Sequence, residues 1–300
     1  MSGVTLGGQP ARLSFASSHR LIIHVPGDLV GGPTPIKVGS LPHATLFVAI
    51  GAVWASGLHQ VDNPVFDAAG NLFVTYSGAR GQESPVSIFR VTPEGTRETF
   101  ASGIVNPTSM ACGPDGHLYV SSRFEGTVYR VGDAGSYEQV ASDLGVACGL
   151  AFDDDGWMYV GDRSGTVFRV RDGRVSTFAT LPSSVVAYHL AMSPRGELFV
   201  CAPMLGAYDH VYRIDREGQV RTLTTTLGRP QGIAFAPDGT LHIIDALAGA
   251  SGLYRFPDLD ATPELVVSGA GLVGVAFGPS GELVVTSNET AYRFPREASA

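Results

Sequence analysis

Charged residues are scarce in this chain. Asp, Glu, Lys and Arg make up 16% of its 300 residues, the formal net charge is −8, and no stretch is rich in Lys or Arg. A protein that binds nucleic acid needs clustered basic side chains to neutralise phosphates. We therefore expect no nucleic-acid partner.

Cysteine is scarce as well. The three cysteines, Cys112, Cys148 and Cys201, lie far apart and form no CxxC pair. The sequence therefore predicts neither a disulfide framework nor a zinc knuckle. The catalytic patterns GxSxG and HExxH are also absent.

Long apolar runs are missing too. The most apolar stretch, residues 44–58, is too short to span a bilayer, so we expect no transmembrane segment. Residues 1–10 do not combine a basic segment with an apolar one, so no signal peptide is visible. Without other information, this favours the cytoplasm.

Glycine, by contrast, is abundant and recurs at a regular spacing. Six times an apolar residue is followed four positions later by a turn glycine, and then by apolar residues two and four positions further on. These glycines, 40 to 46 residues apart, are Gly70, Gly116, Gly156, Gly196, Gly239 and Gly281. A period near 40 with strand-type alternation is typical of a radial β-repeat.

Each repeat predicts four antiparallel strands, which is one propeller blade. The first two strands flank turns such as Pro-Asp-Gly, whose residues favour tight turns. A third strand carries an aromatic residue followed by Arg, and a fourth strand follows a second turn. The pairs are Phe89-Arg90, Tyr129-Arg130, Phe168-Arg169, Tyr212-Arg213, Tyr254-Arg255 and Tyr292-Arg293.

The sixth repeat stops after its third strand, at residues 291–294. Residues 54–57 match the fourth-strand ending at residues 100–103. We therefore predict that residues about 46–56 supply the missing outer strand, which closes the ring and removes two exposed sheet edges. The predicted fold is all-β, a six-bladed β-propeller over residues 41–300.

Residues 1–40 fall outside the period. They contain three strand-like segments, around residues 12–15, 20–25 and 34–38. Forty residues can scarcely bury a core alone. We therefore expect a small β appendage that packs on the propeller or docks on another chain.

The phrase at residues 231–245, QGIAFAPDGTLHIID, resembles the NHL repeat. It also resembles the wider group of six-bladed propellers that includes gluconolactonases of the SMP-30 type, over residues 46–297. The segments LGGQPA (6–11), RLIIHVP (20–26) and GGPTPIKV (31–38) resemble the second half of an IPT/TIG immunoglobulin-like domain. The first half is absent from this sequence, so either the chain start is truncated or the remnant has become a docking arm. This resemblance implies a periplasmic or extracellular protein.

In such a blade, the residues just before the first strand and those ending the second strand lie on one face, around the central channel. We call this face the channel mouth. Its first slot holds Asp62, Thr108, Cys148, Tyr188, Gln231 and Val273, and the next holds Asn63, Ser109, Gly149, His189, Gly232 and Gly274. The second strands end on Tyr76, Ser122, Asp162, Ala202, Asp245 and Ser287. The predicted ligand-binding residues are Asp62, Asn63, Thr108, Tyr188, His189, Gln231, Asp162 and Asp245.

The resemblance implies a divalent metal, Ca or Zn, held at the channel mouth by Glu, Asn and Asp. Asp62 is the candidate ligand, but one carboxylate in the first slot is poor for calcium, which takes six to eight oxygens. Asp162 and Asp245 complete such a site only if they point inward; the alternative is that they bond to the backbone of an adjacent blade. The run Asp153-Asp154-Asp155-Gly156 resembles a calcium loop, but we expect an ordinary turn there. We predict no cofactor unless the lactonase interpretation holds.

Asp62, Tyr188 and His189 are the candidates for catalysis, because histidine titrates near neutral pH and can act as a general acid or base. The alternative is that His189 merely replaces a glycine and bonds to a neighbouring carbonyl. Cys148 is either a nucleophile or an inert thiol. Long loops follow the second strand in three repeats, as functional loops or tolerated insertions. They carry Arg80, Glu83, Met204, Tyr208, Asp209 and His210.

These observations favour a non-catalytic binding protein, a peripheral subunit of a larger assembly that engages a protein partner or a small molecule at the channel mouth. The mixed, mostly uncharged mouth residues and the appendage motivate this hypothesis. The alternative is a metal-dependent lactone or ester hydrolase of the gluconolactonase type.

Overall fold

The computed structural model describes residues 3–39, 46–204, 206, 208–223, 227–247 and 250–294. In these ranges the regular structure is all β, in agreement with the predicted fold class. No helix among them has the length and apolarity needed to cross a bilayer. The chain divides into two compact units, one of Trp54–Ala291 and the other of the segments before and after it.

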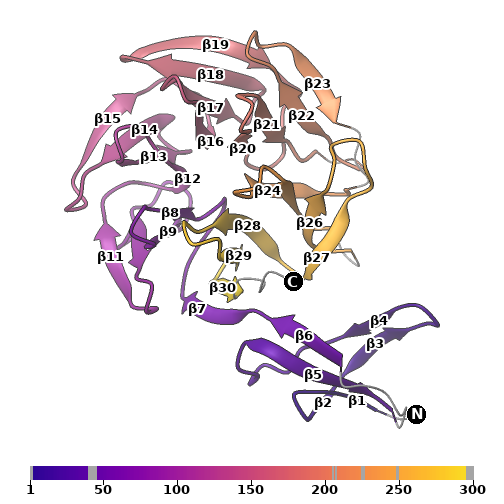
Figure 1. Ribbon diagram of the computed structural model, residues 1–300. Coiled ribbons are helices and arrows are strands. Elements are labelled where there is room, and N and C mark those ends of the chain that lie inside the picture. Colours follow the sequence, from indigo (N-terminus) through magenta and orange to yellow (C-terminus); the bar gives the residue numbers. More distant parts are fainter. Residues whose placement is uncertain are drawn as a thin grey trace. The chain divides into compact units, whose positions relative to one another are not determined.

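Six four-stranded sheets follow the six repeats (Figure 1). The first contains β8 (Val65–Phe66), β9 (Leu72–Thr75), β10 (Ile88–Val91) and β11 (Arg97–Ala101). The second contains β12 (Pro107–Cys112), β13 (Leu118–Ser122), β14 (Thr127–Val131) and β15 (Tyr137–Ala141). The third contains β16 (Ala147–Phe152), β17 (Met158–Asp162), β18 (Thr166–Arg171) and β19 (Arg174–Thr180).

The remaining three sheets continue the pattern. The fourth contains β20 (His189–Met192), β21 (Leu198–Cys201), β22 (Val211–Ile214) and β23 (Val220–Leu223). The fifth contains β24 (Pro230–Phe235), β25 (Leu241–Asp245), β26 (Gly252–Phe256) and β27 (Glu264–Ser268). The sixth contains β28 (Leu272–Phe277), β29 (Leu283–Ser287), β30 (Thr290–Phe294) and, at its edge, β7 (Ala52–Ser56).

The innermost strands β8, β12, β16, β20, β24 and β28 contact one another in cyclic order, and β28 returns to β8. Figure 1 shows these strands nearest the centre of a ring of sheets. This arrangement is that of a β-propeller, in which radial repetition leaves few exposed sheet edges.

The recurring glycine sits in the turn between the first two strands of each sheet. Gly156 has φ of 84° and Gly239 of 85°, a left-handed conformation that glycine adopts without steric cost. In the third sheet, Asp153 Oδ1 accepts a hydrogen bond from Trp157 N at 2.8 Å, and Asp153 O accepts one from Gly156 N at 3.1 Å. The expectation of an ordinary turn at residues 153–156 is confirmed.

Neighbouring sheets pack through the apolar residue that lies four positions before the turn glycine. Phe152, Phe235 and Phe277 end inner strands, and each meets a ring on the second strand of the preceding sheet. The ring centroids lie 4.9 Å apart for Tyr119 and Phe152, 5.2 Å for Phe199 and Phe235, and 4.9 Å for His242 and Phe277. Edge-on pairs of this kind contribute about 0.5–1.5 kcal/mol each beyond area burial.

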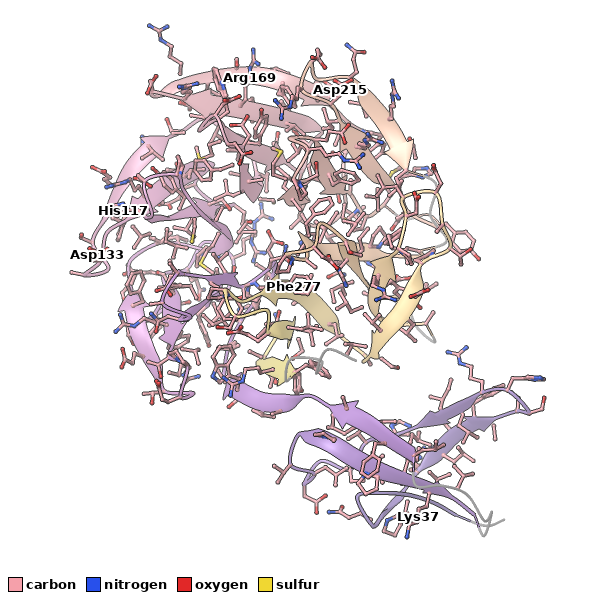
Figure 2. The ribbon with its side chains drawn as sticks, in the orientation of Figure 1. Lys37, His117, Asp133, Arg169, Asp215 and Phe277 are labelled. Atoms are coloured by element: carbon pink, nitrogen blue, oxygen red, sulfur yellow. The ribbon has the colours of Figure 1, made fainter. Side chains whose placement is uncertain are left out.

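The outer rim carries charged side chains. Figure 2 places Arg169 and Asp215 there, away from the centre of the ring. The guanidinium of Arg169 lies 5.0 Å from the centroid of the Trp157 ring. The arginine of this third strand therefore faces outward, as the alternation along a strand predicts.

Ring closure follows the prediction only in part. β7 (Ala52–Ser56) is the edge strand beside β30, as predicted, but Leu46–Ile50 forms β6 and pairs with β5 (Gly32–Val38). The prediction is therefore wrong for residues 46–50. Gly51 separates the two strands, so the chain leaves one sheet and joins the other at this residue. Trp54 on β7 belongs to one buried cluster with Leu72 and Ala291, which joins the first and last sheets.

The smaller unit contains a further four-stranded sheet, the seventh, in the order β2-β1-β5-β6, and a hairpin. Its other strands are β1 (Val4–Leu6), β2 (Gln9–Ala11), β3 (Leu13–Ala16) and β4 (Leu21–Ile23). Among its described residues, Val4, Leu6 and Thr34 are buried, so its core is small. The predicted boundary between residues 40 and 41 lies outside the described residues, and the likeness to an IPT/TIG domain stays a prediction.

Candidate functional site

The loop before β8 and the start of β20 bring two predicted site residues together. Nδ1 of His189 lies 2.5 Å from Oδ1 of Asp62, and each side chain is only 2% exposed. Asp62 lies in the loop that enters the first sheet and His189 begins the fourth, so they reach across the ring from opposite sides. Figure 2 shows polar side-chain tips gathered at the centre of the ring.

The geometry of this pair determines its chemistry. An ionised Asp62 carboxylate can only accept hydrogen bonds, so opposite this form Nδ1 of His189 is protonated and donates a hydrogen bond to it. In the neutral imidazole, Nε2 then holds the free lone pair. Within the described ranges, neither Nε2 of His189 nor Oδ2 of Asp62 has a hydrogen-bond partner, and each side chain is only 2% exposed.

A buried glutamine holds the Asp62 loop in place. Nε2 of Gln60 donates to Asp62 O at 2.7 Å, while Oε1 of Gln60 accepts from Thr75 N at 2.7 Å. The backbone of Gln60 also donates to Asn288 O at 2.8 Å. Gln60 is fully buried, and these bonds fix the loop to the first and sixth sheets. The sequence reasoning missed Gln60, although it lies two residues before Asp62.

Tyr188 does not join the Asp62–His189 pair. Its side chain is fully buried, and its hydroxyl donates to Pro182 O. Burial raises the pKa of the Tyr188 phenol above its usual range. A phenol in this state is a poor general acid or base near neutral pH.

Asn63 joins three sheets at the centre of the ring. Its Nδ2 donates to Ile233 O at 2.7 Å, and its Oδ1 accepts from Val275 N at 3.0 Å. A Cβ at residue 232 would lie 2.7 Å from Oδ1 of Asn63, which explains the glycine there. Thr108 is buried and donates to Asn106 O at 3.0 Å, whereas Gln231 is half-buried.

Asp162 and Asp245 hold backbone rather than pointing to the centre. Oδ1 of Asp162 accepts from Val146 N at 2.9 Å, and Oδ1 of Asp245 accepts from Arg229 N at 2.8 Å. Oδ2 of Asp245 also accepts from Gly228 N at 3.0 Å. These contacts favour the alternative in which both residues support the loop before an inner strand.

The side chains present do not fit the divalent metal that the resemblance implies. In the described part of the chain, no three His, Cys, Asp or Glu residues gather closely enough to hold an ion. Asp62 faces His189, while Asp162 and Asp245 are bonded to backbone amides. Calcium requires several oxygen ligands around one point. We therefore derive no chemical step through a metal.

Cys148 does not have the properties of a nucleophile. It is buried, and burial raises the pKa of its thiol to about 12. The thiolate is the reactive form of cysteine, so this residue is inert near neutral pH.

Two surface hollows lie away from this pair. One is lined by Arg195, Glu197, Arg213, Asp215, Arg216 and Glu217 on the fourth sheet. The other lies between the first and second sheets and includes Phe73, Phe100 and Leu118. In the first hollow Arg213 is paired with Glu197 at 2.6 Å, so its charges compensate each other.

No model of a known protein family matches this chain. No curated protein matches it by sequence either.

Solved structures do match it, and they include propellers of the gluconolactonase type. A gluconolactonase from Xanthomonas campestris has a TM-score of 0.68 at 17% identity, covering 82% of this chain and 89% of that one. Virginiamycin B lyase from Staphylococcus aureus has a TM-score of 0.58 at 12% identity, covering 82% and 87%. An auxiliary nutrient binding protein from Bacteroides ovatus has a TM-score of 0.63 at 12% identity, covering 98% and 91%. At these identities the likeness shows the β-propeller fold.

Proposed function

We propose that this protein is a six-bladed β-propeller enzyme that hydrolyses a lactone or an ester, with the Asp62–His189 pair as its general base. The observation that carries the proposal is the contact between Nδ1 of His189 and Oδ1 of Asp62 at the centre of the ring. This contact leaves Nε2 of His189 as the ring nitrogen that can act as a base. In this proposal, each of the six repeat sheets is one blade.

In the proposed reaction, Nε2 of His189 accepts a proton from a water molecule. The water oxygen attacks the substrate carbonyl carbon, and the bond from that carbon to the ring or ester oxygen breaks. The proton then passes from Nε2 to the departing oxygen, so a lactone and water give a hydroxy acid. Asp62 keeps the imidazole in the required tautomer and stabilises the imidazolium that forms. A positioned base of this kind contributes about 10²–10⁴-fold to a rate.

The comparisons support an enzyme at least as well as a binding protein. Two of the three structures described above carry enzyme names, a gluconolactonase and a lyase. The proposal departs from the metal-dependent alternative of the sequence analysis, because the donor set around Asp62 does not fit a metal.

A second candidate is the non-catalytic binding protein first favoured by the sequence. One observation supports it: the likeness to the nutrient binding protein covers 98% of this chain, so it extends beyond the repeats. In that case the Asp62–His189 pair binds a small molecule without turning it over, and the smaller unit docks on another chain.

A hydrolysis assay separates the two candidates. We would measure turnover of glucono-δ-lactone and p-nitrophenyl acetate in the presence of EDTA, and binding of the lactone by calorimetry. The proposed enzyme turns over at least one of these probes, and Asp62→Asn lowers kcat/KM by about 10²-fold or more because the amide no longer fixes the tautomer. Binding without turnover supports the second candidate instead. Turnover that survives Asp62→Asn contradicts the proposed role of the pair.

A further inference from the structure

Three arginines lie on the channel-mouth side of the first three sheets, and a buried asparagine holds two of their loops together. Oδ1 of Asn106 accepts from Gly81 N at 2.7 Å, and its Nδ2 donates to Ala79 O at 2.9 Å. These bonds hold the backbone on both sides of Arg80. Asn106 O accepts from Arg123 N at 3.4 Å, so Arg80 and Arg123 extend from adjoining loops.

Arg163 occupies the equivalent position in the next sheet. Arg123 directly follows the last residue of β13, and Arg163 directly follows the last residue of β17. Arg163 N donates to Val146 O at 3.3 Å, in the same way as Arg123 N donates to Asn106 O. Because the inner strands of these two sheets contact each other, the two arginines extend from equivalent positions of neighbouring sheets on one face.

None of these three guanidinium groups has an ion pair or a side-chain hydrogen bond within the described ranges. Arginines on the third strands are paired instead, such as Arg90 with Glu98 at 2.6 Å and Arg130 with Asp115 at 2.6 Å. Burial, together with the charges of Arg163 and Arg80, lowers the pKa of Arg123. Cations brought together without a counter-ion repel one another, and a bound anion relieves that repulsion.

Aromatic side chains border the same arginines. The Phe124 side chain is 53% exposed, and its ring would lie 2.9 Å from a Cβ at residue 81. The ring centroids of His59 and Tyr76 are 5.9 Å apart. Burial lowers the pKa of His59, and the charge of Arg123 lowers it further. Glu83 and Glu289 are exposed on nearby loops, but neither is paired with these arginines.

We infer that Arg80, Arg123 and Arg163 form a binding site for an organic anion, a carboxylate or a phosphate joined to a planar apolar group. Guanidinium groups bind both anions through paired hydrogen bonds, and they also stack on aromatic rings. Phe124 supplies the apolar contact. The site does not depend on hydrolysis at His189, because none of its residues belongs to the Asp62–His189 pair.

Calorimetric titration tests this site with benzoate, phenyl phosphate and benzyl alcohol. We expect at least one anion to bind, with an affinity that falls as NaCl is added. Arg123→Gln and Arg163→Gln should each weaken binding by about tenfold or more, since each removes a charged hydrogen-bond donor. The matched control Arg169→Gln, on the outer rim, should leave the affinity unchanged. The two anions tell a carboxylate site from a phosphate site.

Three results would overturn the inference. They are no binding of either anion, binding of benzyl alcohol as tight as that of the anions, or unchanged affinity in both Arg123→Gln and Arg163→Gln. The unfolding midpoint of each variant shows that it is folded. His189→Gln should retain the bound anion, so a failure of the proposed hydrolysis and a failure of this site remain distinguishable.

Discussion

His189 occupies a slot that holds glycine in three of the six repeats. A glycine there lets neighbouring inner strands approach closely, as at Gly149, where a Cβ would lie 2.7 Å from Tyr188 O. The histidine instead extends a long side chain toward the centre of the ring and meets Asp62. Its chemistry follows from that one contact, because the carboxylate decides which ring nitrogen is free.

Tyr188→Phe should leave hydrolysis unchanged. The substitution removes one hydrogen bond, to Pro182 O, and should lower the free energy of unfolding by about 1 kcal/mol. Urea denaturation and the hydrolysis assay measure both effects. A large loss of kcat at unchanged stability would mean that Tyr188 takes part in catalysis.

The buried thiols should resist alkylation. Cys148 and Cys201 are buried, and burial raises the pKa of the Cys148 thiol to about 12. At mildly alkaline pH, iodoacetamide should therefore modify them only after unfolding. Burial also raises the pKa of the Cys112 thiol, to about 11, but Cys112 is exposed and should react first. Mass spectrometry of the native and urea-treated protein distinguishes the sites. Rapid labelling of Cys148 in the native protein would mean that its thiolate is accessible.

The second, third and fifth sheets share one contact where the second strand ends. A short polar side chain bonds to the loop that enters the inner strand, as Asp162 does with Val146 N at 2.9 Å. Ser122 does the same with its hydroxyl, which donates to Val105 O at 2.6 Å. These hydrogen bonds fix the loops on the channel-mouth face, and with them the backbone of Arg123 and Arg163.

Asp162→Ala should lower the stability of the protein equally with and without calcium. The substitution leaves the half-buried Val146 amide without its acceptor, which costs about 1–2 kcal/mol. The matched control Asp154→Ala, at an exposed turn position, should change stability by less than about 0.5 kcal/mol. Thermal unfolding with and without calcium measures both. A calcium-dependent midpoint that Asp162→Ala abolishes would show that Asp162 is a metal ligand.

The sequence predicts the repeated elements well because their cause is local. A turn glycine and alternating apolar residues determine a hairpin within about ten residues of chain. The switch between β6 and β7 was missed because residues 46–56 look like one continuous apolar strand, and only pairing with β5 separates the two. Arg123 and Arg163 were missed because each alone looks like an ordinary exposed loop residue.

In the molecule as a whole, residues far apart in sequence meet where the first and last sheets pack together and at the centre of the ring. Asp62 and His189 are 127 residues apart, so the sequence could place them on one ring of positions but not in contact. Which side chain reaches across depends on rotamers and on the size of the neighbours. Asp162 illustrates the same limit, because its carboxylate could have pointed inward or toward the backbone.

Trp54→Ala tests how the ring closes. Trp54 packs with Leu72 of the first sheet and Ala291 of the last, and is 8% exposed. Its removal should lower the free energy of unfolding by about 3–5 kcal/mol. The other tryptophan, Trp157, is only half-buried, so Trp157→Ala should cost less. Equal costs in chemical denaturation would mean that the contact between first and last sheets contributes little to stability.

The most direct test of the Asp62–His189 pair is the rate of lactone hydrolysis in EDTA by the unmodified protein, by His189→Gln and by the matched buried-histidine control His242→Gln. If His189 is the general base, the unmodified protein hydrolyses glucono-δ-lactone without a metal, and His189→Gln lowers kcat by about 10²–10⁴-fold. His242→Gln then keeps its activity. Equal rates for His189→Gln and the unmodified protein, or hydrolysis that disappears with EDTA, would contradict a base held by Asp62.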